Sequence, residues 1–274
     1  MFKYVDLFSG IGSFGFSFSK LGFDCVMACD IDNPARVNYK NNHGIDALGD
    51  ICDIDPTTIE PYEILCAGLP CQPFSQMGHH QGFEDSRGTM FSQVMRFVNI
   101  NKPKVVLLEN VPALLSHDDG KSFTKIREEL ENEGYTVVYK ILKASDYGIP
   151  QNRRRLFIVG VKNPKIGIDK FFDLDVYKNT TTLSDYLGRN FEKDNAYTLR
   201  VGGRGSGINS RHNWDTYIVD GEEYRLTIDD GLKLQGFTDY KLTGTQTDRW
   251  RLIGNSIPTN FTHIIGKQII NLVR

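Results

Sequence analysis

The chain has 274 residues, of which 40% are hydrophobic and 24% charged, and its formal net charge is −2. That length suits one large domain or two smaller ones, and the composition excludes a disordered, collagen-like or disulfide-scaffold protein. Apolar runs stay well below the ~20 residues of a membrane helix, and the first residues lack a signal-peptide pattern, so we expect no membrane contact and no secretion. The five cysteines lack metal-ligand spacing, which indicates free thiols in a reducing cytosol and no metal site.

The first 165 residues alternate short apolar runs with segments of helical spacing. The predicted strands are Tyr4–Phe8, Cys25–Cys29, Ile64–Ala67, Val105–Leu108, Val137–Leu142 and Leu156–Val161. The predicted helices are Gly12–Leu21, Pro34–Asn41, Phe91–Asn101, Ser122–Glu133 and, near the C-terminus, Asn260–Val273. Apolar strands that alternate with helices predict a parallel, doubly wound α/β sheet that is covered on both faces.

Residues that can carry chemistry directly follow four of the predicted strands. They are Gly10, Asp30, Gly68–Cys71 and Glu109–Asn110, in chain order. Ligands of open α/β sheets bind at the carboxyl ends of the strands. We therefore expect the functional site at this edge of the sheet.

The segment Gly10–Gly15 has a G-x-G-x-x-G pattern between the first predicted strand and the first predicted helix. Glycines allow a tight turn, and a helix N-terminus offers free N–H groups to an anion. Asp30, after the second strand, can accept hydrogen bonds from both hydroxyls of a ribose. By itself the pattern suits NAD, FAD or S-adenosylmethionine, and a plain strand–helix turn is the alternative.

The loop Gly68–Ser75 places a cysteine between two prolines, Pro70 and Pro73, just past a buried strand. Prolines remove backbone donors and fix φ, so the loop holds the Cys71 thiol in one direction. A stiff, partly exposed cysteine at a ligand-binding edge is a candidate nucleophile, with a structural role as the alternative. The remaining cysteines are interpreted as small core residues: Cys25, Cys29, Cys52 and Cys66.

Charge is distributed unevenly along the chain. Residues 24–63 carry nine acids and two bases, whereas residues 140–165 carry seven bases and one acid. The segment Ala196–Trp214 has three arginines and no acid, among several glycines. Such basic segments can face the phosphates or bases of a nucleic acid, or they can be solvated surface.

The alternation of strands and helices ends near Lys165. The segment Gly202–Gly207 contains too much glycine for a regular element. We predict a catalytic domain at residues 1–165 plus 250–274, and a smaller, mostly irregular or β domain with a hinge at residues 166–249.

Seven motifs occur in order along the chain, and together they resemble those of cytosine-C5-specific DNA methyltransferases of the bacterial restriction–modification type. The motifs are DLFSGIGSFGF, GLPCQPFS, GFEDSRGTMF, LLENV, YGIPQNRRRLFIVG, RLTIDDGLKLQGF and RLIGNSIP. The resemblance spans the chain except about residues 166–222, where the family itself varies. It implies a Rossmann-like α/β domain that binds S-adenosylmethionine and a small target-recognition domain, with DNA in the cleft between them.

The resemblance also implies which residues act on cytosine. Cys71 matches the nucleophile that bonds to C6 of a flipped-out cytosine in a covalent adduct, which allows C5 to accept a methyl group. Glu109 matches the acid that faces N3; without the resemblance, a capping glutamate is the alternative. Arg155 is expected beside the cytosine and Cys71, and Arg153 against the loop and the DNA backbone. Strand alternation puts both arginines on one side and Arg154 on the other.

S-adenosylmethionine is the methyl donor that the resemblance implies, with S-adenosylhomocysteine as the product. The residues that match the family's donor site are Phe8, Gly10, Ile11, Gly12, Asp30, Ile31, Asp50, Ile51, Pro70 and Asn255. Asp30 stands where the family usually has Glu, one methylene longer, and Ser13 stands where it usually has Gly. A looser contact with the ribose is therefore expected.

Double-stranded DNA is the expected partner. The candidate DNA-binding residues are Ser75, Met77 and Arg87 near the cysteine loop, and Arg200, Arg204 and Arg211 in the recognition domain. Residues 76–89 resemble the family's mobile catalytic loop, in which Met77, His79 or His80 would fill the gap left by the flipped base. We expect the protein to be a monomer that is encoded by a prokaryote or a phage and located in the cytoplasm at the nucleoid. We also expect a restriction endonuclease that acts on the same DNA site without contacting this protein directly.

Three alternatives are kept beside this interpretation. The nearest is a tRNA cytosine-C5 methyltransferase of the same fold, which the recognition segment and the form of the cysteine loop disfavour. A nicotinamide or flavin oxidoreductase would explain the glycine loop but neither Cys71 nor the run Gln151–Arg155. A catalytically inactive DNA-binding module is disfavoured because Cys71, Glu109 and Arg155 are all present.

Overall fold

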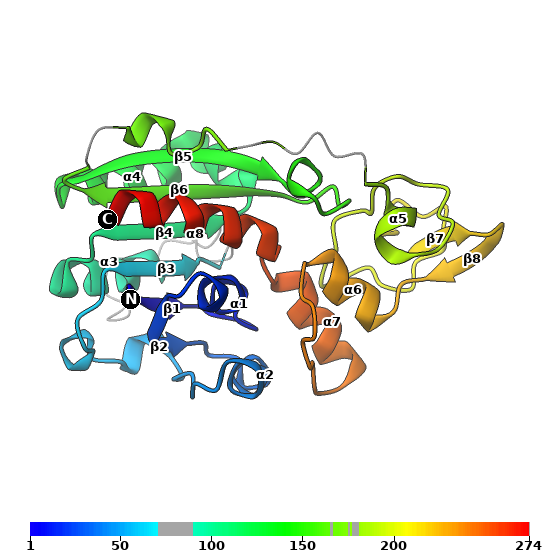
Figure 1. The fold of residues 1–274 in the computed structure, drawn as a ribbon, viewed down its shortest axis with the longest axis horizontal. Coiled ribbons are helices and arrows are strands. Elements are labelled where there is room, and N and C mark those ends of the chain that lie inside the picture. The colour runs from blue at the N-terminus through cyan, green and yellow to red at the C-terminus, as the bar shows by residue number, and fades with distance from the viewer. Residues whose placement is uncertain (71–89, 165–166, 175, 177–180, 274) are drawn as a thin grey trace.

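The computed structural model describes residues 1–70, 90–164, 167–174, 176 and 181–273. Among these residues, six strands form the main sheet in the order β2-β1-β3-β4-β6-β5 (Figure 1). Its strands are β1 (Lys3–Leu7), β2 (Asp24–Cys29), β3 (Ile64–Gly68), β4 (Val105–Asn110), β5 (Tyr135–Lys143) and β6 (Arg154–Lys162). A separate hairpin consists of β7 (Thr216–Val219) and β8 (Glu222–Arg225).

The expected strands and helices are present, with bounds that differ by at most a few residues, but the sheet is mixed rather than fully parallel. β1 pairs in parallel with β2 and β3, and β3 with β4, whereas β6 runs antiparallel to both β4 and β5. The expectation of a wholly parallel sheet was therefore wrong for β6. Residues 144–153, between β5 and β6, hold a 3-10 turn at Ala144–Tyr147 and no crossover helix, so the chain returns beside β5 in the opposite direction.

Helices cover both faces of the sheet. The helices around the sheet are α1 (Ser13–Lys20), α2 (Asn33–His43), α3 (Met90–Asn101), α4 (Lys121–Asn132) and α8 (Thr259–Val273). Three further helices, α5 (Leu183–Leu187), α6 (Ile228–Leu234) and α7 (Gln246–Asn255), lie beyond one end of it. Alternate residues of a strand point to opposite faces. In β4, Val106 and Leu108 join the core beneath α3 and α4, whereas Val105 and Leu107 join the core beneath α1 and α8.

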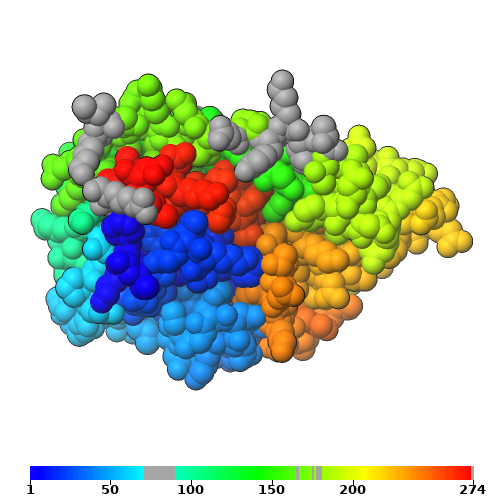
Figure 2. All heavy atoms as spheres, viewed as in Figure 1, coloured from blue at the N-terminus to red at the C-terminus, as the bar shows by residue number. Residues whose placement is uncertain are grey.

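A smaller region lies at one end of the sheet and contains α5, the β7–β8 hairpin, α6 and α7 (Figure 1). Its own core includes Trp214, Tyr217 and Trp250, and this core continues into Ile11 and Ala35 of the sheet region. Figure 2 shows the segments of this region packed directly against the N-terminal part of the chain. The predicted domain boundary at residue 250 falls within α7, the helix that leads back toward the sheet.

Candidate active site

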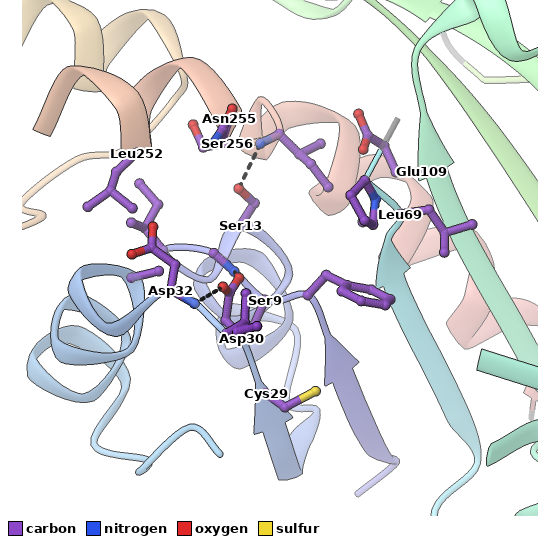
Figure 3. Close-up of a pocket in the computed structure, with 18 of the residues that line it drawn as sticks. Ser9, Ser13, Cys29, Asp30, Asp32, Leu69, Glu109, Leu252, Asn255 and Ser256 are labelled. Carbon is purple, nitrogen blue, oxygen red and sulfur yellow. Dashed lines mark hydrogen bonds between the residues drawn. The ribbon is translucent and has the colours of Figure 1, made fainter. Parts of the chain in front are cut away.

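A cavity of about 730 Å³ opens at the carboxyl ends of β1 to β4, where α7 closes one side (Figure 3). The predicted donor-site residues on its wall are Phe8, Gly10, Ile11, Asp30, Ile31, Asp50, Ile51, Pro70 and Asn255. Glu109 and Arg155, expected to act on the base, line the same cavity. The structure thus brings the two predicted sets of residues together in one place.

The glycine loop lines the cavity next to the start of α1. Gly10 has φ +55°, and a Cβ at this position would meet nothing within 4 Å, so the backbone leaves open space on the cavity side. Gly12, the one predicted donor-site residue that is not on the cavity wall, has φ +81° and instead adjoins His43 and Tyr39 of α2. The absence of a side chain at Gly12 permits this turn and this close packing, and its contact with a ligand stays a prediction.

Asp30 fixes the shape of the loop after β2. Its Oδ2 accepts a hydrogen bond from the backbone N–H of Gly10 at 2.7 Å, and its Oδ1 accepts one from the N–H of Asp32 at 2.8 Å. Burial raises the pKa of the Asp30 carboxyl, while these two donors oppose the rise. Each oxygen retains a lone pair for a further donor, so the carboxylate can also bind a hydroxyl in the cavity.

Glu109 is a buried carboxyl at the end of β4. Its side-chain Oε1 lies 2.8 Å from Nε of Arg155 in an ion pair, and the residue is 7% exposed. Burial raises the pKa of Glu109, against the lowering effect of Arg155 and Arg153. A carboxyl with a raised pKa that faces a cavity is suited to donate a proton or a hydrogen bond.

After β3, the backbone passes beside Glu109 before it reaches Cys71, the predicted nucleophile. The N–H of Leu69 donates to the backbone carbonyl of Glu109 at 3.2 Å, and Nδ2 of Asn110 donates to the carbonyl of Leu69 at 3.3 Å. Pro70, which precedes Cys71, lies on the cavity wall. Cys71 itself and the DNA-binding candidates Ser75, Met77 and Arg87 lie outside the described residues.

The described cysteines have the structural role that was expected. Cys29 and Cys66 are buried, Cys25 and Cys52 are partly buried, and all four are free thiols. Burial raises the pKa of Cys25 and of Cys29 to about 12. These two thiols therefore stay protonated at neutral pH and are poor nucleophiles.

Arg153, expected against the loop and the DNA backbone, is a buried residue. It is 1% exposed, and its guanidinium donates to the carbonyls of Leu199, Gly254 and Ser256 at 2.7–2.8 Å. These bonds hold the side chain within the protein, and a contact with DNA stays a prediction. Alternation along the strand is as predicted, since Arg154 is exposed.

The three recognition-segment arginines lie away from the cavity wall and are each held by a neighbour. Arg204 lies over the ring of Trp250 at 5.0 Å and 3.7 Å from the fully buried Asp215. Arg200 donates to the carbonyl of His212 at 2.9 Å, and Nε of Arg211 lies 3.1 Å from Nε2 of the same histidine. These contacts hold all three side chains within the smaller region.

Several cavity residues were missed by the sequence analysis, among them Ser9, Asp32, Arg251, Leu252 and Ser256. Ser9 and Ser256 each lie next to a predicted site residue, in the motifs DLFSGIGSFGF and RLIGNSIP, and Asp32 lies two positions after Asp30. Their closeness in sequence to predicted residues is the signal that could have identified them. The hydroxyl of Ser9 is buried and has no hydrogen-bond partner among the residues that the structure describes.

In the part of the chain that the structure describes, no helix has the length and apolarity needed to cross a membrane. Within the same residues no group of three or more His, Cys, Asp or Glu side chains could hold a metal ion, and a metal-free site stays a prediction.

Comparison with protein families gives a match to the C-5 cytosine-specific DNA methylase model over residues 2–202. The chain is 35% identical to the Type II methyltransferase M.MspI of Moraxella sp., over 98% of this chain and 70% of that protein. It is also 35% identical to M.HaeII of Haemophilus aegyptius, over 98% and 93%, and 30% identical to M.HhaI of Haemophilus parahaemolyticus, over 97% and 94%.

Solved structures with the same fold include the Dnmt2 methyltransferase of S. pombe, with a TM-score of 0.76 and 19% identity over 99% of each chain. Another is the DNA modification methyltransferase encoded within a prophage of E. coli and described as putative, with a TM-score of 0.73 and 21% identity over 100% of this chain and 99% of that one. At these identities the likeness establishes the architecture of the chain.

Proposed function

The chain belongs to the C-5 cytosine-specific DNA methylase family and is a DNA cytosine-5 methyltransferase of the restriction–modification type, and from this premise we propose a role for each residue of the site. The observation that carries the proposal is the shared cavity. It joins the glycine loop, Asp30, the Glu109–Arg155 pair and the residue before Cys71. Donor and base can therefore meet at one point.

S-adenosylmethionine, which the family uses, supplies an electrophilic methyl group when it is bound. The cavity fits such a molecule because it is large, has a carboxylate at Asp30, and has open space above Gly10. Asp30 would bind the ribose hydroxyls, and Ile31 and Ile51 would contact the adenine. Asn255, at the end of α7, would bind the methionine end, and these contacts would hold the donor still while the base reacts.

Cys71 would act as the nucleophile on the flipped base. Its thiolate sulfur bonds to C6 of cytosine, electron density moves toward C5 and N3, and C5 becomes able to take a methyl group. Glu109 relieves the charge at N3 by donating its proton or a strong hydrogen bond. Arg155 holds Glu109 in place. Loss of the C5 proton and expulsion of the sulfur then restore the aromatic ring.

Duplex DNA would bind against the recognition segment that carries Arg200, Arg204 and Arg211. Arginine reads guanine through two hydrogen bonds in the major groove, and glycine neighbours allow the close approach. Ser75, Met77 and Arg87 would contact DNA from the side of the cysteine loop. We place the enzyme in a prokaryotic cytoplasm, as a monomer on DNA, beside an endonuclease that cuts the same site without touching it.

Covalent trapping tests the central assignment. Duplex DNA with 5-fluorocytosine in the target context should form an adduct with the wild-type protein that survives denaturing electrophoresis when S-adenosylmethionine is present, because fluorine at C5 blocks release of the sulfur. Cys71→Ser should form no adduct and transfer no methyl group. Cys25→Ser, which changes a partly buried thiol with a pKa raised to about 12, is the matched control and should behave as wild type.

A methyl-transfer assay tests the substrate class. Transfer of a tritiated methyl group to plasmid DNA should exceed transfer to tRNA by a wide margin. An adduct formed by Cys71→Ser, or transfer to tRNA alone, would contradict the assignment.

A further inference from the structure

An ion pair crosses the rim of the cavity between two segments that are far apart in the sequence. Asp32 stands at the N-terminus of α2 and Arg251 lies on α7, 219 positions later. Nη1 of Arg251 donates to Oδ2 of Asp32, and Nη2 lies 3.3 Å from Oδ1, so the contact is bidentate. Both residues line the cavity. Two parallel bonds fix orientation as well as distance, unlike a single surface contact.

The pair is held firmly from both ends. Nη2 of Arg251 is also 3.2 Å from Oδ1 of Asp248, one turn earlier on α7. The N–H of Asp32 donates to Oδ1 of Asp30, which is the carboxylate proposed to bind the ribose. A movement at Asp32 therefore reaches the ligand-binding side chain through one hydrogen bond.

Other contacts join the same two parts of the chain without lining the cavity. On α2, Nδ2 of Asn42 donates to the carbonyl of Lys241 at 2.9 Å, and Oδ1 of Asn38 accepts from the N–H of Thr243 at 2.7 Å. The hydroxyl of Tyr240 also donates to the backbone carbonyl of Asn38 at 3.4 Å. Because these neutral bonds hold α2 to the returning chain, loss of the ion pair should open the rim without separating the two parts.

We propose that Asp32 and Arg251 form a clasp that closes the rim of the donor cavity and sets how long S-adenosylmethionine stays bound. The two are positioning residues: they hold the wall that carries Asp30 against α7, and they need not touch the reacting atoms. The proposal rests on the assignment of this cavity to the methyl donor. Their side chains are 23% and 30% exposed, so solvent reaches the pair and the clasp can open and close.

The test measures release of tritiated S-adenosylmethionine from the full-length protein after a chase with excess S-adenosylhomocysteine. Asp32→Asn and Arg251→Met should each speed release by about 3–10-fold, as expected for loss of one partly exposed, well-oriented pair. The double variant should be no faster than either single variant. KM for the donor should rise while kcat does not fall, and Arg251→Lys should restore part of the retention because it keeps the charge.

The controls separate the clasp from general effects. The Asp32 side chain makes no capping bond to α2, so its change to Asn leaves the helix end intact. Asp46→Asn removes the same charge and breaks a 2.6 Å ion pair with Lys40 of α2, away from the cavity wall, and should leave release unchanged. Thermal unfolding of the ligand-free variants should stay a single cooperative transition, with a Tm lowered by no more than about 2–4 °C.

Three results would overturn the clasp. The first is that Asp32→Asn releases S-adenosylmethionine at the wild-type rate. The second is that Asp46→Asn speeds release as much as Asp32→Asn does. The third is a larger effect of Arg251→Met that adds to that of Asp32→Asn, since Arg251 would then contact the donor directly. Failure of the wild-type protein to bind the donor at all would instead overturn the assignment of the cavity, and with it the clasp.

Discussion

The protonation of Glu109 depends on two opposed influences at one residue. Burial disfavours the carboxylate and raises the pKa of Glu109, whereas the positive charges of Arg155 and Arg153 favour it and lower the pKa. The 2.8 Å ion pair makes Arg155 the nearer of the two. If Glu109 acts as an acid, activity requires its protonated form and is lost as the pH rises through the pKa of the folded enzyme.

Arg155→Met should move the alkaline limb of the kcat/KM profile to higher pH. The substitution removes the cation that lowers the pKa of Glu109, so the proton is held to a higher pH, although the maximal rate falls because Glu109 loses its support. Glu109→Gln should remove this limb and reduce kcat by about 10²–10⁴-fold, with donor binding retained. Profiles measured with saturating DNA check both, and a limb that moves to lower pH in Arg155→Met would contradict the role given to the pair.

At the level of elements, the loop between β1 and α1 is shaped by the helix behind it. Nε2 of His43, near the end of α2, lies 3.2 Å from the carbonyl of Ile11. A Cβ on Gly12 would overlap the His43 ring and lie 2.9 Å from Cε2 of Tyr39. The G-x-G-x-x-G pattern therefore serves two purposes, because Gly10 faces the ligand space and Gly12 faces α2.

Gly12→Ala should destabilise the protein more than Gly10→Ala. Both residues have positive φ, which costs a residue with a Cβ about 1–2 kcal/mol. Only Gly12 meets packed side chains, and such overpacking adds about 1–3 kcal/mol. Urea unfolding measures the difference. Equal unfolding free energies for the two variants would mean that His43 and Tyr39 move aside at little cost.

Prediction succeeded for elements whose signal is local. Strands such as β3 and helices such as α3 were located because their apolar spacing is set by the chain itself. The direction of β6 was missed because direction depends on the connection at residues 144–153, and an apolar run reads the same in a parallel or an antiparallel strand.

At the scale of the whole molecule, two buried residues just before β6, Gln151 and Arg153, connect the sheet region to the smaller region. Arg153 donates to carbonyls of Leu199, Gly254 and Ser256, which belong to the recognition segment and to the return to the sheet. Gln151 donates to the carbonyl of Leu234 at 2.6 Å. These buried bonds help to fix the position of the smaller region beside the cavity.

Arg153→Met should lower the free energy of unfolding by roughly 2 kcal/mol or more. The substitution removes the donor of the Leu199 and Gly254 carbonyls, and each buried carbonyl left unpaired costs about 1–3 kcal/mol. The Ser256 carbonyl, in contrast, still accepts a hydrogen bond from Nε2 of Gln235 at 3.3 Å. Arg154→Met, at the exposed neighbouring position, is the control and should change the stability by less than about 0.5 kcal/mol. Calorimetry or urea unfolding compares the two, and similar values would show that the carbonyls find other partners.

The sequence alone determined the layered α/β architecture and the edge of the sheet at which the cavity lies, because apolar periodicity is local and parallel strands bring their carboxyl ends to one edge. It also placed Asp30 and Glu109 at this edge, since each follows a predicted strand, and the resemblance to the family supplied the role expected of each. Only the tertiary structure decided that Arg153 is buried and that Asp32 meets Arg251. Such contacts join segments far apart in the chain, and their geometry depends on how whole elements pack, which no local pattern encodes.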